Sequence, residues 1–236
     1  MKLEDVRKEI DALDPQIKTL ILRRMDCSLE VAKAKQAAGE TTIYRRDREK
    51  AILDRLGADV PADRLPEYLA VVRKIMETSR MFQYGLLFDW NPDLFKELSA
   101  GIDTTPGGWR VKIRLTRPDE PNAMSSILSM VGDYGFNMQY MELMSFNEGT
   151  HSVTFDLTIL GDLSDTAMQK LLFQLSKETL CSVYINQICM KLVAEYLYNA
   201  FRFIFPHQTM IYMYADELLS YRLNQHRCNY GRIYAA

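Results

Sequence analysis

The sequence has few cysteines and histidines, and neither type is grouped. The four cysteines and three histidines are Cys27, Cys181, Cys189, Cys228, His151, His207 and His226. Their spacing matches no common metal-ligand pattern, and no cysteine, histidine or serine arrangement for covalent catalysis accompanies them. We therefore expect no metal site, and we expect free thiols in a reducing cytoplasm.

Long apolar runs and an excess of one charge sign are also missing. No apolar run is long enough to span a bilayer, and the first five residues lack the basic start and apolar core of a signal peptide. The net charge is -2 and the pI about 6.0, which gives no overall attraction to nucleic acid or to anionic membranes. We expect a cytoplasmic, globular protein in which any anion site is a local cluster of arginine and lysine.

Residues 3–38 carry the apolar spacing of one long helix, with apolar side chains at three- and four-residue steps. At ~1.5 Å per residue this helix would be roughly 50 Å long. Since a small globule cannot cover that length, we expect a partner chain to pack along it. Pro15 interrupts the pattern and should kink the helix, or restart it with Asp14 as N-cap.

Helices predicted at 47–56 and 62–87 complete an all-helical domain over 1–90. The stretch 91–108 is rich in proline and glycine, which indicates a linker with at most one short helix. Strands are predicted at 109–116, 138–146, 152–160 and 182–188, and helices at 122–134 and 164–177. This β-α-β-β-α-β order is typical of a ferredoxin-like α+β domain, which we place at 109–187.

The segment 188–236 has no clean period and no functional interpretation. A docking helix and a sequence that is not under selection both fit its short apolar bursts.

Polar residues fall on or beside the apolar seams of the three N-terminal helices. They are Arg7, Arg24, Lys35, Arg48, Glu49, Ser79 and Gln83. Four cations against one carboxylate indicate an anionic ligand. Two arginines suit a ligand with two carboxylates, because each guanidinium can bind one carboxylate through two hydrogen bonds.

Each of these residues alone also has a structural explanation. Arg24 can pair with a buried carboxylate or extend to water, and Ser79 and Gln83 can be satisfied core residues. Arg7 and Lys35 can be solvated charges at the edge of a seam. The whole set, rather than any member, favours a binding site.

Residues 1 to about 90 resemble the all-helical chorismate mutases of the AroQ class. The matching stretches are VRKEIDALD, LRRMDCSLEVAKAK, IYRRDREKAIL and METSRMFQ. The resemblance implies an intertwined helical homodimer that isomerises chorismate to prephenate in phenylalanine and tyrosine biosynthesis. It also implies a [3,3] rearrangement that needs no cofactor.

The resemblance gives every seam residue a role. Catalytic residues of the family correspond to Arg24, Lys35, Arg48, Glu49 and Gln83, and substrate-binding residues to Arg7 and Ser79. Arg7 would reach into the partner protomer's site, so a kink at Pro15 would displace it. The family often has aspartate at the position of Arg45, where the backbone amide contacts the substrate. In IYRRDREKAIL, we therefore expect Arg45 and Arg46 to be solvated or to support Arg48 and Glu49.

The stretch RPDEPNAMSSILSMVGDYGFNMQYMEL resembles an ACT domain, the small ligand-sensing fold of amino-acid biosynthetic enzymes, over about 109–180. Asn122 stands where the family has a glycine, and asparagine tolerates a positive φ best after glycine. The resemblance implies phenylalanine or tyrosine as effector, bound near Asn122, Ala123, Met124 and Glu142. The sequence ELMS at 142–145 replaces the Glu-Ser-Arg-Pro of prephenate dehydratases, which counts against phenylalanine. A structural dimerisation module is the alternative.

Two functions remain open. The first is an active mutase with an ACT-type regulatory or dimerising domain. The second is a non-catalytic, mutase-like sensor of an aromatic amino acid that regulates a partner enzyme. The complete polar set favours the first function, because a non-catalytic protein should have lost some of these polar residues.

Overall fold

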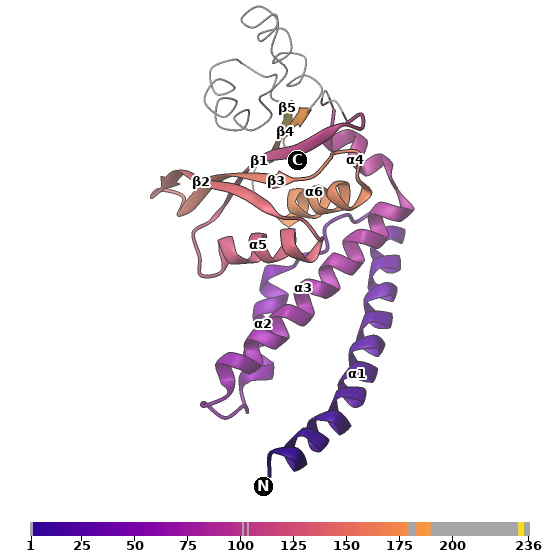
Figure 1. The fold of residues 1–236 in the computed structure, drawn as a ribbon, viewed down its shortest axis with the longest axis vertical. Helices are drawn as coiled ribbons and strands as arrows, with labels where there is room; N and C mark the ends of the chain where they lie inside the picture. The colour runs from indigo at the N-terminus through magenta and orange to yellow at the C-terminus, as the bar shows by residue number, and fades with distance from the viewer. Residues whose placement is uncertain (1, 101, 103, 179–182, 190–230, 234–236) are drawn as a thin grey trace, which may run out of the picture. The chain divides into compact units, whose positions relative to one another are not determined.

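The computed structural model describes residues 2–100, 102, 104–178, 183–189 and 231–233. The chain divides into two compact units, Met1–Pro92 and Asp93–Ala236. The first is helical and the second holds the sheet (Figure 1). No helix among the described residues is long and apolar enough to cross a membrane.

Three helices form the first unit: α1 (Leu3–Ala37), α2 (Arg46–Gly57) and α3 (Leu65–Trp90). Helix α3 contacts both α1 and α2. It starts three residues later than predicted, because Pro66 suits a first helical turn, and it ends just before Pro92. Its buried residues are Val72, Met76, Ser79, Arg80, Gln83, Tyr84, Leu87 and Phe88. This stripe is the core of the unit.

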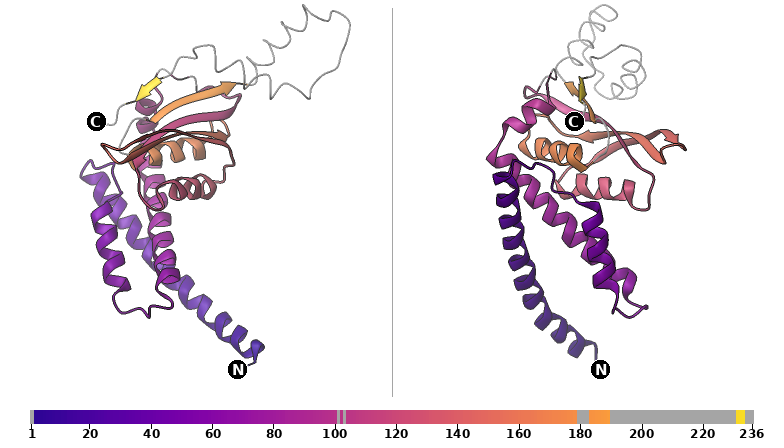
Figure 2. Two further views of the ribbon diagram at one scale, coloured as in Figure 1. Left: turned by 90° about the vertical axis from the view of Figure 1, so that its left-hand side faces the viewer. Right: turned by 180° about the vertical axis from the view of Figure 1, so that it is seen from behind.

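Helix α1 is one continuous helix, so the prediction that it restarts at Asp14 is wrong (Figure 2). Pro15 removes only one backbone donor, and the helical hydrogen bonds around it continue. The Gln16 side chain donates to the carbonyl of Ala12 at 3.1 Å, and the Thr19 hydroxyl donates to the carbonyl of Pro15 at 2.9 Å. The proline thus removes only the helical bond to the Asp11 carbonyl, and the carbonyls of Ala12 and Pro15 each accept a side-chain hydrogen bond.

Most of the apolar stripe of α1 is exposed within a single chain. Only Ser28 and Ala32 of this helix are buried. Exposed members of the stripe include Leu3, Ile10, Leu13, Ile17, Leu20 and Val31. An apolar surface of this length is uncommon on a monomer and is typical of an interaction surface.

The second unit contains α4 (Asp93–Leu98), β1 (Gly108–Pro118), α5 (Ala123–Asp133), β2 (Met138–Asn147), β3 (Ser152–Leu160), α6 (Thr166–Glu178), β4 (Val183–Cys189) and β5 (Gly231–Ile233). The predicted element order is confirmed. Helix α4 lies in the predicted linker, and β5 lies in the segment 188–236, most of which is outside the described residues. The sheet is antiparallel throughout, in the order β2-β3-β1-β4-β5. Helices α5 and α6 cover one of its faces (Figure 1).

The predicted alternation of β1 is confirmed. Val111, Ile113 and Leu115 are fully buried with the apolar residues of β3 and α6. On the other face of β1, Arg114 donates to both carboxylate oxygens of Asp156, at 2.6 and 2.8 Å, and Lys112 lies 3.0 Å from the same carboxylate. Burial alone would raise the pKa of the Asp156 carboxyl, but together the two cations hold that pKa below its usual value.

Candidate active site

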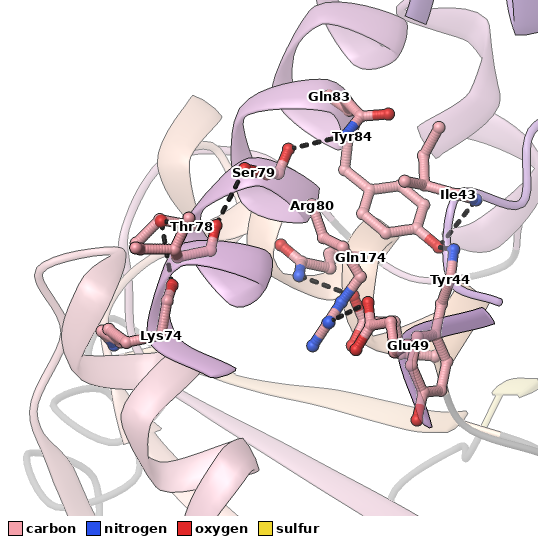
Figure 3. A network of polar contacts seen from close by, with 12 residues as sticks. Ile43, Tyr44, Glu49, Lys74, Thr78, Ser79, Arg80, Gln83, Tyr84 and Gln174 are labelled. Carbon is pink, nitrogen blue, oxygen red and sulfur yellow. Dashed lines mark hydrogen bonds and ion pairs between the residues drawn. The ribbon is translucent and has the colours of Figure 1, made fainter. Parts of the chain in front are cut away.

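The buried stripe of α3 carries the polar residues of the candidate site. Ser79, Arg80 and Gln83 are 6%, 8% and 7% exposed. They lie within little more than one helical turn, so their side chains share one side of α3. Figure 3 shows Arg80 beside Glu49 and Tyr44, with Ser79 and Gln83 on the same helix. Buried polar groups at this density need partners, and the neighbouring elements supply most of them.

Arg24 of α1 reaches Ser79 of α3. Its Nη1 atom donates to the Ser79 hydroxyl, and it lies 3.4 Å from the carbonyl of Ile75. Arg24 is exposed within the single chain, which fits the interpretation that its guanidinium faces an open site rather than a closed core. No carboxylate among the described residues pairs with Arg24, so its charge remains available to an anion.

Lys35, in the last turn of α1, is held by the loop that follows. Its Nζ atom lies 3.0 Å from the Glu40 carboxylate and donates to the Thr42 carbonyl at 2.7 Å. Arg45 binds the same carboxylate at 3.1 Å. Hydrogen bonds from Lys35 and Arg45 lower the pKa of the Glu40 carboxyl, so Glu40 stays ionised and orients both cations. The Lys35 side chain is only 16% exposed, so it is not a solvated charge at the edge of the seam.

Glu49, in the first turn of α2, is paired with a residue that the sequence analysis did not select. Arg80 Nη1 lies 2.5 Å from Glu49 Oε1, and the guanidinium carbon lies 4.8 Å from the centre of the Tyr44 ring (Figure 3). The backbone N–H groups of Ile43 and Tyr44 both donate to the Tyr84 hydroxyl, at 3.1 and 3.2 Å. Two residues of α3 one turn apart thus fix the segment that leads into α2.

Gln83 presents an unsatisfied acceptor inside the unit. Its Nε2 atom donates to the Ser79 carbonyl at 3.0 Å, whereas its Oε1 atom is buried without a hydrogen-bond partner. A buried acceptor without a partner is unfavourable, so a ligand could bind to this amide. A rotation of the amide by 180°, which exchanges its oxygen and nitrogen, is the other way to change what it offers. A bound hydroxyl group that donates a hydrogen bond to Oε1 would resolve the mismatch.

Arg7 and Arg48 are not joined to these groups in the single chain. Both side chains are exposed, and neither makes a hydrogen bond or ion pair within the described part of the protein. Of the predicted site residues, α3 therefore contacts Arg24 and Glu49 directly. Lys35 is ordered separately by Glu40, and Arg7 and Arg48 project outward.

Arg80, Tyr84 and Glu40 were missed from the sequence. A signal for two of them existed, because Val72, Met76, Arg80, Tyr84 and Phe88 recur at strict four-residue steps and are all buried. The predicted seam continued from Met76 through Ser79 and Gln83, which are also buried, and left out the adjacent row at Arg80 and Tyr84. Glu40 sits in a loop, where no periodicity marks a contact.

Comparison with known families decides the identity of this unit. Residues 6–84 match the family model for chorismate mutase type II. These residues form a chorismate mutase domain. The resemblance predicted for the first half is confirmed in this respect, and the domain supports chorismate mutase activity with chorismate as substrate. No curated protein and no solved structure matches the chain.

The predicted effector residues lie on two elements of the second unit. Asn122 precedes α5 with a φ of 69°, as expected for an asparagine in a glycine position, and is followed by Ala123 and Met124. Glu142 is exposed on β2, opposite Asp156 of β3. Among the described residues, no hydrogen bond or ion pair joins Glu142 to the turn at Asn122. An effector site that uses both stays a prediction.

Proposed function

We propose that the protein is an active chorismate mutase whose site is built on α3 of the chorismate mutase domain. The observation that carries the proposal is the contact of the α3 stripe with Arg24 and Glu49, next to the unsatisfied Gln83 oxygen. These residues come from three different helices. Together they offer a cation, a carboxylate and an amide to one ligand.

The proposed mechanism is electrostatic. Arg7 from a partner protomer and Arg24 bind the two carboxylates of chorismate and hold it in its compact diaxial shape. Arg48 adds to the cationic field, and Lys35 donates to the ether oxygen, which becomes more negative as its bond breaks. Gln83 donates to the same oxygen through Nε2, which then gives up its hydrogen bond to the Ser79 carbonyl. Because these donors are fixed before the reaction, they favour the transition state over the extended ground state.

Glu49 and Ser79 complete the proposed site. Glu49 accepts a hydrogen bond from the ring hydroxyl, and Ser79 positions Arg24. The rearrangement is unimolecular, so it calls for neither a nucleophile nor a cofactor.

We further propose that two chains pair along α1. The exposed apolar stripe of this helix supports the pairing, because association would remove it from water. Pairing also explains why Arg7 makes no hydrogen bond or ion pair with the described residues of its own chain. On this proposal a complete site needs Arg7 from the partner.

The second unit is proposed to be an ACT-type, ferredoxin-like domain that regulates the mutase or stabilises the dimer. Its β-α-β-β-α-β order, its antiparallel sheet and the positive φ of Asn122 support this assignment. Phenylalanine and tyrosine are the effectors to test.

Incubation of the purified protein with chorismate, followed by NMR of the products, tests the proposal. We expect prephenate as the product, in the presence of EDTA and without any added cofactor, and a change in rate when phenylalanine or tyrosine is added. Binding of chorismate without turnover by a folded dimer would instead identify a non-catalytic sensor.

A further inference from the structure

Arg80 is a nearly buried cation at the centre of the chorismate mutase domain, and none of the proposed roles uses it. Its side chain is 9% exposed, whereas that of Glu49 is 23% exposed. Burying a guanidinium is unfavourable unless it is paired and hydrogen-bonded. The ion pair with Glu49 and the stacking on Tyr44 are therefore two contacts that help to keep Arg80 in place.

Helix α2, which carries Glu49, is less buried than the helix that carries Arg80. None of its twelve residues is buried, so the helix lacks an apolar face locked into the core. A glutamate side chain with three rotatable bonds would then sample many positions. The contact with Arg80 fixes the carboxylate from the buried side, since Arg80 belongs to the most buried stripe of the domain.

The negative charge of Glu49 gives a second reason for its pairing with Arg80. A bare carboxylate next to a dianionic substrate would repel it, at short range and in a partly buried site. Paired with Arg80, Glu49 can accept a hydrogen bond from the substrate while the pair as a whole carries no net charge.

We propose that Arg80 is a positioning residue that orients and neutralises Glu49 for the ring hydroxyl of chorismate. This inference rests on the proposed mutase function. Arg80 would act through Glu49 and need not contact the substrate.

Steady-state kinetics of chorismate consumption by Arg80→Met, Arg80→Lys, Glu49→Gln and Arg80→Met/Glu49→Gln tests the inference. We expect Arg80→Met to lower kcat/KM by about 10–100-fold, the scale of a misplaced catalytic group. Arg80→Lys should restore most of the loss because it keeps the charge. In the Glu49→Gln background, Arg80→Met should lower kcat/KM by less than about threefold. The effects of the two substitutions should not add, because Arg80 acts through Glu49.

Arg73→Met is the matched control, since Arg73 is exposed on the same helix seven residues earlier. It should stay within about twofold of the unchanged protein. If Arg80→Met does not give the circular dichroism spectrum of the parent, Arg80→Gln replaces it in the same cycle. Equal losses from the Arg80 change in both backgrounds, or no rescue by lysine, would overturn the inference while the mutase function stands. Absence of turnover by the unchanged protein would overturn both.

Discussion

Lys33 and Lys35 lie two residues apart on α1 and differ in their surroundings. The Lys33 side chain is 54% exposed and pairs with Glu30, whereas that of Lys35 is 16% exposed and is held by Glu40 and Thr42. We expect Lys35→Ala to lower kcat/KM by roughly 10²–10³, about 2–4 kcal/mol, as for the loss of one charged donor to a developing oxyanion. Lys33→Ala should have little effect. Equal behaviour of the two variants in a chorismate assay would remove Lys35 from the site.

Single residues also show how far the sequence could predict the site. Arg24, Ser79 and Gln83 were found because a polar side chain interrupts an apolar period. Arg80 was not found, because the predicted seam passed through the neighbouring positions Ser79 and Gln83. The partners of Lys35 and Arg45 were not predicted either, since Glu40 lies in a loop whose conformation depends on tertiary contacts rather than on a repeat.

At the scale of secondary structure, Pro15 is the least favourable residue of α1. It lies inside the helix, where proline costs about 3 kcal/mol relative to alanine in an exposed interior. We expect Pro15→Ala to raise the free energy of unfolding by about 1–3 kcal/mol, since part of that cost is already relieved by local adjustment. Thermal and urea unfolding measure this at fixed protein concentration. A less stable variant would contradict this expectation and mean that Pro15 itself contributes to a contact along α1.

The apolar stripe of α1 makes a second prediction at this scale. Ile17 is 51% exposed in the single chain, and a glutamate there would place a charge in the proposed dimer interface. We expect Ile17→Glu to shift the mass measured by light scattering from twice 27.4 kDa to a single chain. Gln16→Glu adds the same charge at the neighbouring exposed position and should remain dimeric. A dimer that survives Ile17→Glu would exclude this face as the interface.

The sheet of the second unit offers a test of pH dependence. Because the pKa of Asp156 is lowered on folding, its ion pairs stabilise the fold at pH values above the pKa of the unfolded chain, about 3.9. That stability is lost as the pH falls through the lower pKa of the folded state. Asp156→Asn should therefore reduce the free energy of unfolding by about 2–3 kcal/mol at pH 7, by loss of its charged hydrogen bonds.

The difference between Asp156→Asn and the parent protein should shrink in unfolding curves as the pH falls through the lowered pKa of the parent carboxyl, where that group also becomes protonated. Thr158→Val, on the same face of β3, is a suitable control that leaves the charges unchanged. A difference that stays constant with pH would show that the ion pairs contribute nothing.

The order of helices and strands was predictable because apolar periods of 3.6 and 2 are local properties. The start of α3 at Leu65 rather than 62, and the short helix α4 inside the predicted linker, depend on proline positions and on packing against α6. What covers the apolar stripe of α1 could not be predicted from local patterns, because the surface that we propose to cover it belongs to a second chain.

At the scale of the whole molecule, the proposed exchange of Arg7 between protomers predicts complementation. Arg7→Ala and Arg24→Ala should each be nearly inactive alone. Mixed and re-paired, half of the dimers would hold one intact site of two, so about one quarter of the parental activity should return. A mixture no more active than its components would show that each chain builds its site alone.

The most direct test of the central claim is kcat/KM for chorismate consumption, measured side by side on the full chain and on Arg24→Ala. Our account predicts turnover by the full chain without cofactor, and a loss of roughly 10²–10³ in the variant, because Arg24 is the cation that contacts Ser79 on the α3 stripe. Values within a few-fold of each other would contradict the account and place the chemistry of this domain elsewhere.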